Sequence, residues 1–146
     1  MKECHVYIET SLRWPHKGDG IVGIVLTDSD DTFSKTVFGI VKDATPNSAI
    51  LMGIKNALGY LAKYDDIHLH LSCAYVANNF DRLPSWEATS WMSSRGEPIK
   101  NKELWQEIAK KVKGKRIKIH LNEFNGYRNW LIHECDMRGR RHGFIL

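Results

Sequence analysis

Polar and apolar residues alternate in several short stretches of the chain, and this pattern predicts a β-sheet. Another stretch, residues 21–26, is a continuous apolar run rich in β-branched residues, which is typical of a buried strand. The sequence therefore predicts strands at residues 6–8, 21–26, 35–42, 67–71 and 115–121. The first three follow one another through polar turns, including residues 28–34, so we expect a hairpin meander.

Helical patterns occupy the segments between and after these strands. Thr45 is predicted as the N-cap and Pro46 as the first residue of a helix that carries a largely apolar face. Further helices are expected at residues 74–80, from Ser85 onward, at 101–112 with Asn101 as cap, and at 127–137, ending near Gly139. The order strand, helix, strand implies a right-handed crossover that pairs the first and fourth strands in parallel. We expect a single domain over residues 1–146, with a basic tail at 136–146.

The composition is that of one ordinary folded domain. Of the 146 residues, 42% are hydrophobic and 26% are charged, and no apolar run approaches the roughly 20 residues needed to cross a bilayer. Cys4, Cys73 and Cys135 are too widely spaced for a zinc motif or a disulfide framework. The N-terminus shows no apolar leader, so we expect reduced thiols, a cytoplasmic location and no membrane partner.

Positive charge is concentrated in the second half of the chain. The net charge is +4 and the pI is about 9.0. The basic residues gather after Arg95, at Lys100, Lys102, Lys110, Lys111, Lys113, Lys115, Arg116 and Lys118, and again at Arg138, Arg140 and Arg141. A one-sided basic half favours a polyanionic partner such as a nucleic acid, and the alternative is a solvated lysine-rich helix.

A tryptophan-rich stretch in the second half carries a family signature. It reads Trp86, Trp91, Arg95-Gly96, Pro98-Ile99-Lys100-Asn101 and Leu104-Trp105. This stretch resembles the substrate-handle region of type 1 ribonucleases H, and Tyr7-Ile8-Glu9-Thr10-Ser11 resembles the family's F-T-D-G-S. The resemblance covers about residues 6–136. It implies an α/β fold with a five-stranded mixed sheet, strand order 3-2-1-4-5, flanked by helices.

Members of that family hydrolyse RNA in RNA–DNA hybrids with two Mg²⁺ ions held by four carboxylates. Carried over one at a time, the carboxylate positions fall on Glu9, Ile50, Ser72 and, in the last helix, His133. A shift of less than one turn would bring Glu134 or Asp136 to the last position. The resemblance thus implies a degenerate catalytic site with at most two of four carboxylates. No cofactor is firmly expected, and Mg²⁺ or Mn²⁺ would be needed only for residual activity.

The resemblance also assigns nucleic-acid-binding residues. Trp86, Trp91, Arg95 and Lys100 would form the handle along the phosphate backbone, and Asn47 would contact the RNA strand in the minor groove. For the two tryptophans, the alternative is packing between the handle helix and its neighbour. For Asn47, the alternative is a hydrogen bond to the backbone at the helix start.

The histidines of the fourth predicted strand offer a substitute metal site. His68, His70 and Ser72 are each two residues apart and share one face of the strand. If Glu9 lies on the neighbouring strand, Glu9 and His70 would suit Zn²⁺ or Mn²⁺ better than Mg²⁺. The alternative is that these histidines only satisfy hydrogen bonds beneath the helices.

Three functions follow from this sequence. The first is a nucleic-acid-binding ribonuclease H-like protein, for RNA–DNA hybrids or structured RNA, whose metal-dependent nuclease activity is lost or severely weakened. The second is an active hybrid endoribonuclease with a rearranged metal site, and the third is a protein-interaction module on the same fold. Neutral side chains at Ile50 and Ser72 disfavour the second function, and the retained handle residues favour the first over the third.

Overall fold

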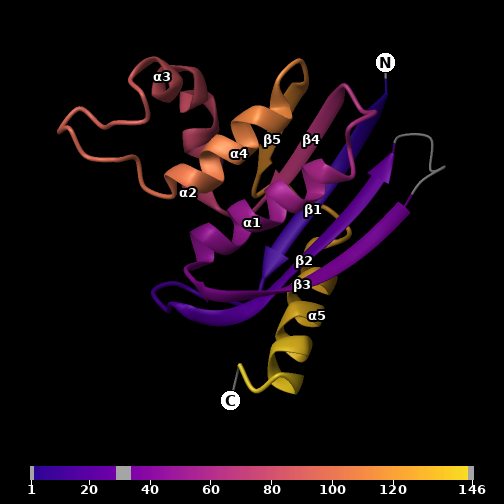
Figure 1. Cartoon of the computed structure of the whole chain (residues 1–146). Helices are drawn as coiled ribbons and strands as arrows, with labels where there is room; N and C mark the ends of the chain where they lie inside the picture. The colour runs from indigo at the N-terminus through magenta and orange to yellow at the C-terminus, as the bar shows by residue number, and fades with distance from the viewer. Residues whose placement is uncertain (1, 29–33, 145–146) are drawn as a thin grey trace.

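A mixed sheet forms the centre of the fold in the computed structural model, which describes residues 2–28 and 34–144. Its strands are β1 (Glu3–Thr10), β2 (Gly18–Asp28), β3 (Ser34–Ala44), β4 (Asp66–Leu71) and β5 (Arg116–Leu121). Strand β1 is antiparallel to β2 and parallel to β4, and the order across the sheet is β3-β2-β1-β4-β5 (Figure 1). The predicted five-stranded sheet and its order are confirmed. Most of the polar turn expected at residues 28–34 lies outside the described residues.

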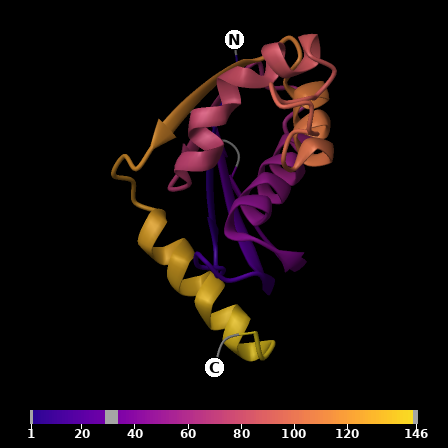
Figure 2. The same ribbon diagram turned by 90° about the vertical axis from the view of Figure 1, so that its left-hand side faces the viewer.

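Helices cover both faces of this sheet (Figure 2). On one face lie α1 (Pro46–Gly59) and α4 (Lys102–Val112), and on the other lies α5 (Arg128–Arg141). The segment between β4 and α4 contains α2 (Ala74–Asn79), the 3₁₀ turn η1 (Phe80–Arg82) and α3 (Leu83–Ala88). Side chains of β1 point alternately to the two faces of the sheet. Val6 and Ile8 enter the core beneath α1, whereas every second residue from Glu3 to Glu9 points to the opposite face. No helix within the described residues is long and apolar enough to cross a membrane.

Helix α1 is fixed at both of its ends. At the start, Ser48 N donates to Thr45 Oγ1 at 3.0 Å and Thr45 N donates to Ser48 Oγ at 2.9 Å, which is a capping box. Beyond the other end, Lys115 Nζ donates to the carbonyl oxygens of Leu61, Ala62 and Tyr64 at 3.1, 3.1 and 2.7 Å. Lys115 therefore binds backbone carbonyls of the chain itself, although its charge alone had suggested contact with a polyanionic partner.

The tryptophan-rich handle packs around one buried indole. Trp105 is fully buried, and its ring centroid lies 5.3 Å from that of Trp86, which is itself 8% exposed. Trp91 is half-buried, with its ring centroid 6.0 Å from Trp86. Asn101 is the N-cap residue of α4, but its side chain donates to Tyr75 Oη at 3.4 Å instead of capping the helix. This packing joins the handle to the main hydrophobic core.

The last helix is longer than the sequence pattern predicted. The expected end near Gly139 is wrong, because α5 continues to Arg141 and includes most of the residues assigned to a basic tail. Gly139 is buried within the helix, and the residue with the left-handed conformation is Gly143, at φ 76°. There the N–H groups of Gly143 and Phe144 donate to the carbonyls of Arg140 and Gly139. The arginines of the last turn suit the negative end of the helix dipole.

Candidate functional site: a cleft at the ends of two strands

A cavity of about 600 Å³ opens where β1 and β4 end beside the start of α1. Glu9 reaches it from β1, Ile50 from α1 and Ser72 from the segment after β4. The structure thus brings together the residues that the family resemblance placed at three ligand positions. The remaining wall is made by Thr10, Leu12, Arg13, Trp14, Pro46, Asn47, Cys73, Ala74, Tyr75, Arg128 and Ile132.

Glu9 is the acidic residue of this cleft. Ser72 Oγ donates a hydrogen bond of 2.8 Å to Glu9 Oε2. Burial raises the pKa of Glu9, and the Ser72 hydrogen bond and the nearby Arg128 and Arg13 charges act against that rise. Ile50 is 5% exposed and offers no ligand atom. Among the residues that the structure describes, Glu9 is the only carboxylate in the cavity wall.

Helix α5 does not bring an acidic residue to the cleft within the described chain. It presents Arg128 and Ile132 there, which are four residues apart and share one helical face. His133 is exposed and lies outside the cavity wall. Asp136 lines a neighbouring cavity and pairs with Arg13, Nη2 to Oδ1, at 3.1 Å. His133 therefore lies outside the cleft, whereas Asp136 is linked to the cleft wall through Arg13.

The charge balance of the cleft differs from that of a two-metal site. One carboxylate, Glu9, faces the guanidinium groups of Arg128 and Arg13, and Arg13 is also paired with Asp136 behind the cavity wall. Two Mg²⁺ ions require several anionic oxygen ligands, so the residues present do not fit that pair of ions. Guanidinium groups instead suit the oxygens of a phosphate.

The opposite wall links the cleft to the handle. Cys73 Sγ donates to Asn47 Oδ1 at 3.2 Å, so Asn47 lies at the cavity with its carbonyl already engaged. Tyr75 lines the same cavity, and its hydroxyl accepts from Trp105 Nε1 at 3.2 Å. The handle loop that follows carries Arg95 and Lys100, both exposed.

The three thiols differ in their access to this cleft. Cys73 lines the cavity and is half-buried, and burial raises the pKa of its thiol. Cys4 and Cys135 are fully buried, and burial raises their pKa values to about 11 and about 12. Cys73 is thus the thiol in contact with the cleft.

Glu9 and His70, the suggested metal-binding pair, do not belong to a common group of potential metal ligands among the described residues. His70 Nε2 lies 2.9 Å from His5 Nδ1, and burial lowers the pKa of His70 to about 4. The group of three potential metal ligands that the structure contains is Glu3, His5 and His68. Sequence reasoning missed Glu3 and His5, although the predicted pairing of the first and fourth strands was the signal that could have placed His5 beside His68.

Comparison with known proteins fits this geometry. The family model described as RNase H matches residues 1–128. The chain belongs to the ribonuclease H family. The ribonuclease H of Acetivibrio thermocellus is 32% identical over 133 residues, which cover 86% of this chain and 88% of the relative. The match to the family model ends at residue 128, where α5 begins. The last-helix ligand position of this ribonuclease H family member therefore lies beyond the region that the family model matches.

Solved structures share the fold of this ribonuclease H family member. RNase H1 of Halobacterium salinarum superposes with a TM-score of 0.68 at 17% identity, over 96% of this chain and 98% of that chain. A foamy viral protease-reverse transcriptase in complex with an RNA/DNA hybrid gives a TM-score of 0.72 at 17% identity, over 94% of this chain and 20% of that chain. At such identities, the likeness concerns the fold alone.

Proposed function

We propose that this ribonuclease H family member binds nucleic acid, as an RNA–DNA hybrid or structured RNA, with its metal-dependent nuclease activity lost or severely weakened. The observation that carries the proposal is the charge of the cleft, where Glu9 faces Arg13 and Arg128. Ile50 and Ser72 supply no further negative charge for a cation. A phosphate group, in contrast, gains from Arg128 without a metal ion, and Arg13, which is paired with Asp136, adds a weaker attraction.

The handle supports the binding half of this proposal. Arg95 and Lys100 are exposed on the loop that leads from Trp91 to α4, and Tyr75 joins this region to the cleft. Basic side chains along such a path neutralise successive phosphates. The foamy viral enzyme, which contains a region of the same fold over 20% of its chain, is seen in complex with an RNA/DNA hybrid, and this makes an RNA–DNA hybrid the first ligand to try.

A hybrid cleavage assay with a titration of Mg²⁺ and of Mn²⁺ tests the catalytic half. We expect no cleavage above the level of the Glu9→Gln variant at any metal concentration. Cleavage by the wild type that Glu9→Ala abolishes would contradict the proposal. It would establish the second candidate, an active endoribonuclease with a rearranged metal site, which the 32% identity to a protein named ribonuclease H favours.

A salt titration of binding tests the other half. The logarithm of the binding constant for a labelled hybrid should fall linearly with the logarithm of salt concentration, and Arg95→Gln and Lys100→Gln should each reduce the steepness of this slope by about 1. Lys35→Gln is the matched control, because Lys35 lies on β3 at the far edge of the sheet. Insensitivity to salt and to both substitutions would count against nucleic-acid binding and favour a protein-interaction module.

A further inference from the structure

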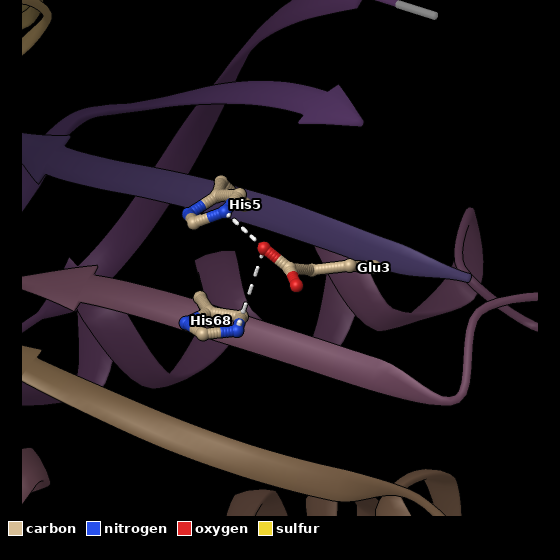
Figure 3. A group of neighbouring side chains, drawn as sticks. All are labelled: Glu3, His5 and His68. Carbon is tan, nitrogen blue, oxygen red and sulfur yellow. Dashed lines mark hydrogen bonds and ion pairs between the residues drawn. The ribbon is translucent and has the colours of Figure 1, made fainter. Parts of the chain in front are cut away.

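A cluster of histidines lies on the sheet face opposite α1, near the beginning of β1 and β4. His5 and His68 pair across these strands, and their ring centroids are 4.5 Å apart. The Glu3 carboxylate faces the edges of both rings (Figure 3), with Oε1 2.8 Å from His5 Nε2 and 3.7 Å from His68 Nε2. The three potential ligand atoms are all within 4.8 Å of one another, and each side chain is partly exposed.

The hydrogen bonds of His120 determine which nitrogen of His68 is free. A carboxylate can only accept, and Glu123 Oε2 lies 3.0 Å from His120 Nδ1, so this nitrogen carries a proton. In a neutral His120, Nε2 then accepts from His68 Nδ1 at 2.8 Å. A neutral His68 thus presents an unprotonated Nε2 to Glu3 Oε1 and Asp66 Oδ1, each 3.7 Å away. The lone pair and the two carboxylate oxygens repel one another, and a cation between them would relieve this repulsion.

A metal ion satisfies this arrangement better than a proton does. A proton on His68 Nε2 would add a positive charge to a ring stacked against His5 and His120. A divalent ion would be shared by His5 Nε2, His68 Nε2 and the Glu3 carboxylate. The proton that His5 Nε2 donates to Glu3 would then move to His5 Nδ1, which would donate to His70 Nε2, and the imidazoles would stay neutral. Lys118, beside His68 on β5, is exposed, so solvent screens its charge.

We propose that Glu3, His5 and His68 bind a divalent transition-metal ion, with Zn²⁺ as the reference ion. Two imidazoles and a carboxylate, with water in the fourth position, are a ligand set that Zn²⁺ uses in proteins. Tetrahedral ligands at about 2.0–2.1 Å from the ion lie about 3.3 Å from one another. The separations of 2.8 and 3.7 Å between Glu3 Oε1 and the two histidine nitrogens lie on either side of this value.

Both proposed histidine ligands are held by partners at their other ring nitrogen. His5 Nδ1 meets His70 Nε2 at 2.9 Å, and His68 Nδ1 donates to His120, which in turn donates to Glu123. Metal-binding histidines almost always have such a partner, which fixes the ring orientation and the tautomer. The outer layer expected of a metal site is therefore in place.

This site is separate from the cleft of the proposed function. Glu3 and Glu9 are six residues apart on one extended strand, which is about 20 Å. An ion at Glu3 therefore does not contact Glu9, and each site can be tested without the other.

The test uses the full chain without a histidine tag, made metal-free with a chelator, and Zn²⁺ alone as the probe. Calorimetric titration and metal analysis after dialysis should give one equivalent per chain, and Co²⁺ should give the visible absorption of a tetrahedral ion. Glu123→Gln should weaken Zn²⁺ binding by about 10–100-fold through the outer layer. The ligand substitutions Glu3→Gln and His68→Gln should weaken it further.

Matched variants keep the outcome clear. His133→Gln, which changes an exposed histidine on α5, should leave Zn²⁺ affinity unchanged. Circular dichroism checks that each variant folds, and Glu3→Gln decides the test if His68→Gln does not fold. The proposal is overturned if no Zn²⁺ binds, if Glu3→Gln has no effect, or if Glu9→Gln abolishes binding. Protonation of His68 in NMR spectra without metal uptake would overturn it as well.

Discussion

Glu9 keeps a carboxylate in a cleft where burial opposes its charge. A pKa that is higher in the folded than in the unfolded chain means that the folded chain holds the proton more tightly. The corresponding stability is present below the unfolded pKa and is lost as pH rises through the folded one. The carboxyl group of Glu9 therefore lowers the free energy of unfolding at neutral pH.

Replacing Glu9 with Gln tests this at the residue scale. Gln stays neutral and can still accept from Ser72, so Glu9→Gln should have a higher free energy of unfolding than the wild type at pH 7. The difference should vanish at about pH 3 and below, well under the unfolded pKa of about 4.3, where the wild-type side chain is protonated in both states. Urea unfolding at both pH values measures it, and Glu97→Gln in the exposed handle loop is the control. A difference that grows on acidification would contradict the assignment.

Lys115 offers a second residue-scale prediction. Its ammonium group binds three carbonyl oxygens that follow α1. Lys115→Met should reduce the free energy of unfolding by about 1–3 kcal/mol, because these carbonyls lose a charged donor. Denaturant unfolding measures the loss, and Lys113→Met, which changes an exposed lysine two residues earlier, should have little effect. Equal losses in both variants would rule out the specific role.

At this scale, the sequence could predict part of the cleft. Glu9, Ile50 and Ser72 were found because short motifs tie them to recognisable strand and helix ends. Arg128 and Ile132 were missed, because the face that α5 turns to the cleft depends on how it packs on the sheet. Glu3 and His5 were missed because their ligand geometry arises only from the register of β1 with β4.

At the scale of elements, close packing against Gly23 sets the position of α5. A Cβ atom on Gly23 would lie 2.9 Å from Cys135 Sγ and 2.9 Å from Phe38 Cε1. Cys135 Sγ also donates to the carbonyl of Glu9 at 3.6 Å, which ties α5 to β1. The small residue therefore allows the helix to approach the strands that carry the acidic residue.

Gly23→Ala should consequently destabilise the fold by about 1–3 kcal/mol through overpacking. Gly39→Ala on the neighbouring strand is the matched control, since its Cβ would meet only Val22 Cγ1, at an ordinary 3.8 Å. Thermal unfolding compares the two variants, and adding Cys135→Ala to Gly23→Ala should recover part of the loss. Equal stability of the two glycine variants would show that α5 does not depend on this contact.

The elements themselves were largely predictable. Strict alternation identified β1, β4 and β5, and Thr45 with Pro46 marked the start of α1. The end of α5 was not predictable, because glycine often ends a helix but Gly139 has helical neighbours on both sides. The backbone conformation that ends the helix is at Gly143.

At the scale of the whole molecule, the cleft can be rebuilt toward a metal site. Ile50→Glu combined with Ser72→Asp would place three carboxylates around one cavity, including Glu9. Without metal, this variant should lose on the order of 3 kcal/mol of stability, because three carboxylates in one cavity repel one another and lose hydration. Millimolar Mg²⁺ should raise its melting temperature but not that of the wild type. The neutral pair Ile50→Gln with Ser72→Asn controls for shape, and a Mg²⁺ response of that pair would refute the explanation.

The access of Cys73 to the cleft gives the protein a chemical reporter of its own. Cys4 and Cys135 are fully buried, so an alkylating reagent at mildly alkaline pH should label Cys73 first in the folded chain. A hybrid that lies across the cleft should slow this labelling, whereas one held by the handle loop alone should leave the rate unchanged. Mass spectrometry of the labelled peptide would then map the path of the bound strand without a single substitution.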